Sequence, residues 1–388
     1  MELVIKNARV YRNHRFEDRE VLIQNGTIAQ VAPRVDAPAG CQVLDLGGKR
    51  LVPGFIDVHT HGGAGVDVNA ATADQLNNTI GKFFASQGTT GWLASVLTDT
   101  PEQTLWCIEQ IKQAKAQTGD HAQLLGVHLE GPFLASEYKG AMPEHLLQKG
   151  NAELFRRYAK AAEGSIKYMT VSPEVEGVPD MIRQIAGEVV VAIGHSGADY
   201  DTAMACIDAG AASATHTFNA MKLLHQHFPA IMGAVLETDV YCEAICDGRH
   251  LHPGTVRFLI KCKGLDRVVA ITDSIMAAGL PDGNYMLGVN DVVVEDGDAK
   301  LASNGTRAGS TLTTGQALKN LVKFTGRPVE EVLPLLTENP ADLLKMGNQK
   351  GRIRPGWDAD LVVLDEDLTV VRTLVGGRTV FEKARNHP

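Results

Sequence analysis

Short apolar runs and amphipathic segments alternate through the middle of the chain. The clearest of these runs, 189–193, consists entirely of apolar residues, as expected of a strand that is buried on both faces of a parallel sheet. The runs lie at 55–58, 89–96, 124–129, 168–171, 189–193, 211–215, 240–246 and 268–271. Segments with helical periodicity separate most of them, for example 73–87, 101–117 and 200–209, and an inserted hairpin is expected at 287–300. Eight strands that alternate with helices over about 290 residues predict an α/β fold, a TIM-like (β/α)8 barrel.

Both ends of the chain have a different pattern. Strand-like segments separated by turns occupy 2–53, 360–364, 369–375 and 378–381. Asn25-Gly26, which lies between two of these segments, is a strong signal for a hairpin. We expect the two ends to form one small β-sandwich domain from residues 1–53 plus 347–388, beside a barrel formed by residues 54–346.

The composition is that of an ordinary globular protein. The 388 residues include 37 Lys and Arg against 46 Asp and Glu, a net charge of −9, and no basic block suggests a nucleic-acid partner. No apolar run approaches the roughly 20 residues of a membrane helix, so no membrane association is expected. The N-terminus lacks the pattern of a signal peptide, and the six scattered cysteines are typical of free thiols in a reducing compartment. These features predict a cytoplasmic protein.

Side chains that can bind a metal follow several of the predicted strands. His59 and His61 end the first strand, and because residues i and i+2 share one face of a strand, both imidazoles can reach one ion. Glu130 follows the third strand, His195 the fifth and His216 the sixth. The carboxyl ends of barrel strands lie at one rim, so we expect these side chains to converge there. The set suits a divalent metal, with Zn²⁺ the best match, and Glu130 could bind one ion or bridge two.

Asp273 follows the eighth predicted strand and should lie at the same rim. Taken alone, an aspartate in this position is typical of a helix N-cap. Beside a metal, which lowers the pKa of a bound water to about 7, it is the natural general base. It could take a proton from that water and later give it to the leaving group. The constellation predicts hydrolytic attack on an amide or a similar acyl-type carbon.

Five segments together resemble the amidohydrolase superfamily. They lie at 53–61, 128–133, 194–196, 215–221 and 271–273. The segments Leu-Glu-Gly-Pro-Phe at 129–133 and Thr-His-Thr-Phe-Asn-Ala-Met at 215–221 are specific, and they are similar to the N-acetylglucosamine-6-phosphate deacetylase family, which includes deacetylases of N-acetylgalactosamine-6-phosphate. The resemblance covers essentially the whole chain. It implies an amidohydrolase barrel with a flanking β domain, a homodimer, and removal of acetate from the 2-acetamido group of an amino-sugar phosphate.

The resemblance also implies roles for individual residues. Asp273 matches the catalytic acid and base, and His250 matches a histidine that polarises the substrate carbonyl or holds the sugar. Asn219 and Ala220 match contacts to the substrate, and Leu312 resembles a contact near the sugar. The principal metal ligands of the family correspond to Glu130, His195 and His216, and the two-histidine version of its first strand corresponds to His59 and His61.

The chain departs from the family at two substrate positions. Met142 stands where the family commonly has a sugar-contacting histidine. His227 stands where the family has an arginine that reaches the phosphate, often in the partner subunit. Arginine binds phosphate bidentately and stays charged, and histidine does neither reliably at neutral pH. The sequence offers Lys139, Lys222 and Arg249 as candidate replacements.

Three other functions would use parts of the same pattern. The same chemistry on a different or unphosphorylated N-acyl substrate would account for the changes at Met142 and His227. A cyclic-amide hydrolase of the superfamily generally carries a carboxylated lysine between its metals, where this chain has Glu130. A non-catalytic metal-binding protein would not need Asp273 beside a full set of ligands.

Overall fold

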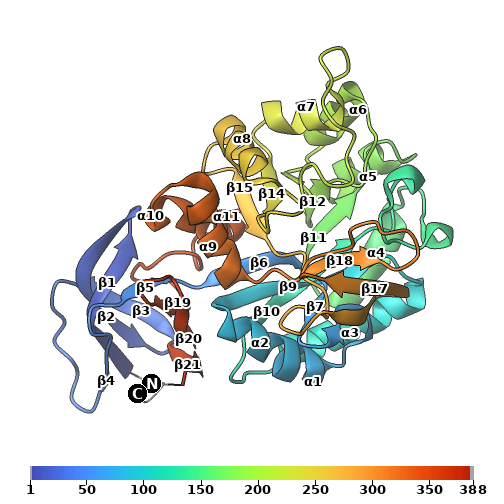
Figure 1. Ribbon diagram of the computed structural model, residues 1–388. Helices are drawn as coiled ribbons and strands as arrows, with labels where there is room; N and C mark the ends of the chain where they lie inside the picture. The colour runs from blue at the N-terminus through green and yellow to red at the C-terminus, as the bar shows by residue number, and fades with distance from the viewer. Residues whose placement is uncertain (1, 385–388) are drawn as a thin grey trace.

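The structure, a computed structural model, describes residues 2–384. Eight parallel strands form one sheet that curves into a nearly closed barrel (Figure 1). In sequence order they are β6 (Phe55–Thr60), β9 (Thr89–Leu97), β10 (Gln123–Glu130), β11 (Ile166–Val171), β12 (Val190–Ile193), β13 (Ser213–Ala214), β14 (Tyr241–Ile245) and β15 (Val268–Ile271). The predicted barrel is therefore confirmed.

The first and last barrel strands meet through contacts beyond the regular sheet pairing. The backbone N–H of Asp273 donates to the carbonyl of His59 at 2.9 Å, and that of His61 donates to the carbonyl of Ser274 at 2.8 Å. These bonds close the barrel at its carboxyl rim. They also fix the residue after β15 beside the end of β6, although the two lie more than 200 positions apart.

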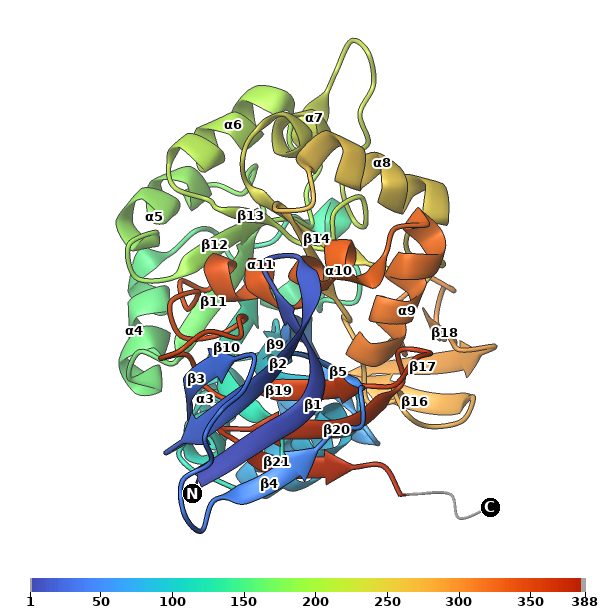
Figure 2. The ribbon, with the colours of Figure 1, turned by 90° about the vertical axis from the view of Figure 1, so that its left-hand side faces the viewer.

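Helices cover the outside of the barrel (Figure 2). Those that follow the barrel strands are α3 (Pro101–Lys115), α4 (Ala152–Ala162), α5 (Val178–Ile185), α6 (Tyr200–Asp208), α7 (Ala230–Glu237) and α8 (Pro253–Lys263). After β15 come α9 (Thr314–Thr325), α10 (Val329–Val332) and α11 (Glu338–Leu343). No helix within residues 2–384 is both long enough and apolar enough to cross a membrane.

The helix predicted at 73–87 is present but changes its hydrogen-bond pattern along its length. It consists of α1 (Ala73–Gln75), a π-helical turn at Leu76–Gly81, and α2 (Lys82–Ser86). The carbonyl of Gly81 accepts a hydrogen bond from the backbone N–H of Ala122 at 3.0 Å, outside the helix. A Cβ on Gly81 would lie 3.1 Å from that of His121, a tighter contact than most Cβ atoms make, so glycine suits this close approach. The π-helical stretch therefore ends at a residue that makes a long-range contact.

Strands from both ends of the chain form a second sheet with its own apolar core (Figure 1). They are β1 (Glu2–Arg12), β2 (Arg15–Gln24), β3 (Thr27–Ala32), β4 (Gln42–Asp45), β5 (Arg50–Pro53), β19 (Leu361–Leu364), β20 (Val370–Val375) and β21 (Arg378–Glu382). Asn25 and Gly26 both have positive φ, 51° and 82°, as the predicted hairpin turn requires. This is the predicted β sandwich. Residue 1 and residues 385–388 of the predicted domain lie outside the described residues.

The hairpin predicted at 287–300 is part of a larger insertion. Three antiparallel strands form it: β16 (Gly283–Leu287), β17 (Asn290–Glu295) and β18 (Asp298–Leu301). The first strand was missed because its alternating positions are mostly exposed, so it carries little apolar pattern. The insertion packs against the barrel rim in an apolar cluster that includes Leu97, Met142 and Ile275. A two-stranded ribbon, β7 (Gly62–Gly63) and β8 (Val66–Asp67), follows β6 at this rim.

Candidate active site

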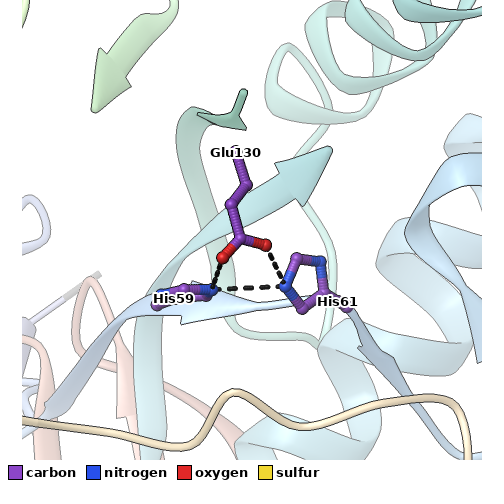
Figure 3. Close-up of side chains that lie close together, drawn as sticks. All are labelled: His59, His61 and Glu130. Atoms are coloured by element: carbon purple, nitrogen blue, oxygen red, sulfur yellow. Dashed lines mark hydrogen bonds and ion pairs between the residues drawn. The ribbon is translucent and has the colours of Figure 1, made fainter. Parts of the chain in front are cut away.

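The two histidines at the end of β6 converge on the carboxylate at the end of β10. The Nε2 atoms of His59 and His61 are 3.2 Å apart. Glu130 lies above them, with Oε1 3.5 Å from His59 Nε2 and Oε2 3.0 Å from His61 Nε2 (Figure 3). All three side chains are buried. His59, His61 and Glu130 therefore converge at the ends of their strands, as predicted.

Glu130 also belongs to a second group of possible ligands. Its Oε1 lies 3.0 Å from Nε2 of His195 and 3.4 Å from Nε2 of His216. Those two nitrogens are themselves 3.0 Å apart. One carboxylate thus stands between two pairs of imidazoles, as it would to bind one ion or bridge two.

The other ring nitrogen of each histidine is held by an oxygen acceptor. The partners are Glu243 Oε2 for His59 (3.0 Å), the Ser95 carbonyl for His61 (3.1 Å), the Tyr138 carbonyl for His195 (2.8 Å) and the Asn219 carbonyl for His216 (3.1 Å). A carbonyl or carboxylate oxygen only accepts, so each Nδ1 must carry the hydrogen. Each Nε2 therefore faces Glu130, where it can bind a cation once it has released any proton it carries. This is the arrangement of metal-ligating histidines, and the residues fit a divalent cation.

The charges of the cluster also favour a cation. Burial alone would lower the pKa of His61, but the carboxylates of Asp273 and Glu130 outweigh it and raise that pKa to about 9. Burial alone would raise the pKa of Glu130, but His59 and His195 hold it well below its usual range. The buried carboxylates therefore stay ionised, and positive charge among them is stabilised.

Asp273 completes the cluster from the end of β15. Its Oδ1 lies 3.3 Å from Nε2 of His61 and 3.5 Å from Nε2 of His59. Burial raises the pKa of Asp273, but the two histidines lower it by more, so the net shift of the pKa is downward. An ionised carboxylate next to the cation-binding nitrogens can accept a proton from a water held there.

Three of these residues have left-handed backbone conformations. The φ angles are 47° at His195, 28° at His216 and 48° at Asp273. Such angles are uncommon for residues other than glycine and cost free energy. Each of the three is the second residue after a barrel strand, and the turn there directs its side chain into the cluster. Backbone strain at a cluster of this kind is typical of a functional site.

A cavity of about 360 Å³ opens onto the cluster. Of the residues predicted to contact substrate, Met142, Asn219, Ala220 and His250 line it. The ring of His250 is fixed by Asp247, whose Oδ2 lies 2.6 Å from Nδ1.

Two predicted substrate residues lie elsewhere. His227 is exposed on the 222–229 loop and does not line the cavity within this chain. Leu312 is buried, donates its backbone N–H to Ser310 Oγ at 3.0 Å, and does not line the cavity either. A substrate contact of either residue within its own chain stays a prediction.

A model of the amidohydrolase family matches residues 50–380, which is most of the chain. The chain belongs to the amidohydrolase family. The N-acetylglucosamine-6-phosphate deacetylase of Lysinibacillus sphaericus is 34% identical to this amidohydrolase over 381 residues, 97% of each chain. The N-acetylgalactosamine-6-phosphate deacetylase of Escherichia coli O157:H7 is 33% identical over 365 residues, 94% of this chain and 95% of its own. The resemblance to this deacetylase family is confirmed.

Solved structures of deacetylases share the whole architecture of this amidohydrolase. The N-acetylglucosamine-6-phosphate deacetylase of Pasteurella multocida matches with a TM-score of 0.90 and 29% identity over 98% of this chain and 99% of its own. A mutant of the Mycobacterium smegmatis enzyme, in complex with N-acetyl-D-glucosamine-6-phosphate, also matches with a TM-score of 0.90, at 33% identity over 98% and 99% of the two chains. Membership in the family implies a divalent metal, and the two His/Glu groups could hold one.

Two residues of the amidohydrolase site were missed by sequence reasoning. Glu243 is fully buried in β14, behind His59, and its Oε2 also accepts the backbone N–H of His216 at 2.8 Å. A carboxylate inside an apolar strand was a signal that could have found it. Arg307 lies after β18 and lines the cavity. Its exposed, loop-like sequence surroundings offered no comparable signal.

Proposed function

We propose that this amidohydrolase hydrolyses the acetamido group of an N-acetylated amino-sugar phosphate. The substrate is N-acetylglucosamine-6-phosphate or N-acetylgalactosamine-6-phosphate, and the products are the amino-sugar phosphate and acetate. The observation that carries the proposal is the position of Asp273, which lines the cavity and whose Oδ1 lies within 3.5 Å of two metal-ligand candidates. The named relatives of the chain support this substrate class.

The metal in this proposal is zinc, as one or two ions. Imidazole nitrogens with one carboxylate are a ligand set that Zn²⁺ prefers. When bound, a divalent ion polarises a carbonyl oxygen and lowers the pKa of a water. The residues that would hold it are His59, His61, Glu130, His195 and His216.

Asp273 moves the proton in this reaction. Its carboxylate accepts a proton from the attacking water through Oδ1 as the water adds to the amide carbon. The same carboxyl group then protonates the amide nitrogen, so that the carbon–nitrogen bond breaks and the amine leaves uncharged. The low pKa of Asp273 leaves it ionised and able to start the cycle at neutral pH.

The sugar is held by the wall of the cavity. With Nδ1 bonded to Asp247, His250 has only Nε2 free to contact the carbonyl or a hydroxyl group of the sugar. Asn219 and Ala220 lie three and four positions after His216 and place an amide and backbone groups at the same cavity. Met142 supplies apolar surface where other family members have an imidazole, so one polar sugar contact is absent from this position.

The partner in this proposal is a second copy of the chain. The loop between α6 and α7 extends beyond the helices in both views (Figures 1 and 2). It carries three exposed apolar side chains, Leu223, Leu224 and Phe228, with exposed fractions of 63%, 54% and 69%. Apolar side chains that cluster in this way are typical of a protein interface. A homodimer would cover them and bring His227 near the partner subunit.

Six free thiols agree with a cytoplasmic enzyme.

The substitution Asp273→Asn tests the proposal. It keeps the shape of the side chain and removes its ability to accept a proton. We expect acetate release from the zinc-loaded protein to fall by about 10²- to 10⁴-fold. Metal content, measured by mass spectrometry, should stay as in the wild type. Asp239→Asn, the same change at an exposed position, serves as the control and should leave turnover unchanged.

The substrates to compare are the two phosphorylated sugars and their unphosphorylated forms. Preference for a phosphorylated sugar supports the proposal. Activity only on the unphosphorylated sugars would show that the chemistry has moved to another N-acyl substrate. If wild type and Asp273→Asn bind metal equally and neither releases acetate, the protein binds metal without catalysis.

A further inference from the structure

Arg307 is the one Arg or Lys among the described residues that line the cavity. It shares this wall with His250 and Asn219, and the metal-ligand candidates line the same cavity. The cavity therefore contains one permanently cationic side chain besides the histidines.

The guanidinium of Arg307 is fixed in place but keeps hydrogens to donate. Its Nε and Nη2 donate to the carboxylate of Asp298 at 2.7 and 2.8 Å, and its Nη1 donates to the carbonyl of Arg249 at 3.2 Å. Arg307 in turn holds the pKa of Asp298 at about 2, so both groups are charged at neutral pH. Nη1 and Nη2 each carry a second hydrogen beyond these bonds. A pre-oriented guanidinium loses little conformational entropy when it binds an anion.

The position of Arg307 along the chain suits a sugar phosphate. Ser310 donates its backbone N–H to the carbonyl of Asp273 at 2.8 Å, so this segment runs beside the proton-transfer residue. Arg307 precedes Ser310 by three positions, a span of at most about 11 Å for extended backbone. In the substrate, the acetamido group and the phosphate lie on opposite sides of the sugar ring. An acetamido group beside Asp273 would direct the other end of the sugar along this segment.

We propose that Arg307 binds the phosphate of the substrate, in place of the arginine that this chain lacks at position 227. The inference rests on the proposed function, because it assigns a residue to the phosphate of that substrate. Arg307 contributes both its charge and the remaining hydrogens of Nη1 and Nη2, the pair of donors that matches two phosphate oxygens.

The other candidate cations do not line the cavity. Lys139 donates to the Met142 carbonyl at 3.3 Å, and Arg249 donates to the carbonyl of Asp296. Neither of them, nor Lys222, lines the cavity in the described chain. Glu137 also lines the cavity and would repel a phosphate. A cationic side chain in the same cavity would offset this repulsion.

The kinetic test compares Arg307→Gln with wild type on N-acetylglucosamine-6-phosphate and on N-acetylglucosamine. We expect kcat/KM to fall by about 10- to 100-fold for the phosphorylated sugar, mainly through KM, and to stay unchanged for the unphosphorylated one. Arg307→Lys should restore part of the loss, because it keeps the charge. Lys300→Gln is the matched control: Lys300 pairs with the same Asp298 at 3.3 Å but does not line the cavity. An equal loss on both sugars would assign Arg307 a structural role and overturn the inference.

A binding test separates this inference from the proposed function. Calorimetry with the wild-type protein should show glucosamine-6-phosphate binding more tightly than glucosamine, and Arg307→Gln should lose that gain. No gain in wild type, or an equal gain in both proteins, overturns the role of Arg307. A gain that depends on Arg307 without acetate release from any acetylated sugar upholds the inference and contradicts the proposed reaction.

Discussion

At the scale of single residues, the site depends on what lies behind each histidine. The four imidazoles face Glu130 because an oxygen acceptor holds each Nδ1. Three of those acceptors are backbone carbonyls, and the fourth is the buried carboxylate of Glu243. A charged acceptor raises the basicity of the imidazole that it contacts, so His59 should bind metal more strongly than a carbonyl partner would allow.

Glu243→Gln should therefore weaken metal binding while preserving geometry. The glutamine oxygen can still accept from His59 Nδ1 and from the N–H of His216, but the charge is lost. We expect metal affinity, measured by competition with a chelator, to fall by about 10- to 100-fold. Glu237→Gln, an exposed change on α7, should leave it unaltered. Unaltered affinity in Glu243→Gln with a native circular dichroism spectrum would mean that Glu243 only fills space.

At the scale of elements, the β16–β18 insertion forms part of the cavity wall. Leu287 at the end of β16 is 3% exposed, packs in the apolar cluster that joins the insertion to the rim, and also lines the cavity. The side-chain amide of Asn290 donates to the carbonyl of Ala141 at 2.7 Å, next to Met142. The insertion thus packs directly behind the residues that contact the sugar in our proposal.

Leu287→Ala should disturb both stability and substrate binding. Removing a buried leucine leaves a cavity and costs about 2–5 kcal/mol of unfolding free energy. We expect urea denaturation to show this decrease in the free energy of unfolding. We also expect a higher KM, because the cavity wall loses its support. Val289→Ala, in the adjacent turn and 69% exposed, is the comparison and should change neither quantity noticeably. Equal behaviour of the two variants would contradict the role given to the insertion.

At the scale of the whole molecule, one buried lysine joins the barrel to the segment that leads into the sandwich. Lys350 is 4% exposed and donates to Asp358 and Asp360, just before β19, at 2.8 and 2.7 Å. It also donates to Gln123, the first residue of barrel strand β10, at 2.9 Å. The metal site needs the barrel alone, so this contact serves the assembly of the two parts.

Lys350→Met should destabilise the protein without altering its chemistry. The change leaves two carboxylates without their cation, which costs about 3–5 kcal/mol of unfolding free energy. Burial lowers the pKa of Lys350, but Asp360 and Asp358 outweigh it and raise that pKa above 10.5. The stabilisation is therefore fully present at neutral pH and is lost only as the pH rises through the raised value.

Urea unfolding at neutral pH is the measurement for Lys350→Met. Lys319→Met removes a half-exposed lysine that pairs with Asp367, and it should cost at most about 1 kcal/mol. If the two variants lose the same stability, Lys350 does not join the parts in the way proposed.

Several features could be predicted from the sequence because they depend on neighbours along the chain. The barrel follows from the short apolar runs, and the rim positions of His59, Glu130 and Asp273 follow from where those runs end. The helix at 73–87 and the hairpin at 287–300 are present, but the π-helical stretch of the first and the additional strand β16 of the second could not be predicted, since Gly81 bonds outside its helix and β16 has little apolar pattern. The domain boundaries at 53 and 347 stay predictions.

The sequence by itself determined the order of strands and helices and the set of possible ligands, because periodicity and residue type are local properties. Only the tertiary structure decided which side chains stand behind the ligands and which line the cavity. Glu243 contacts His59 across 184 positions, and Arg307 reaches the cavity from an insertion after the last barrel strand. Such contacts depend on how distant segments pack, and no pattern within either segment encodes the distance between them.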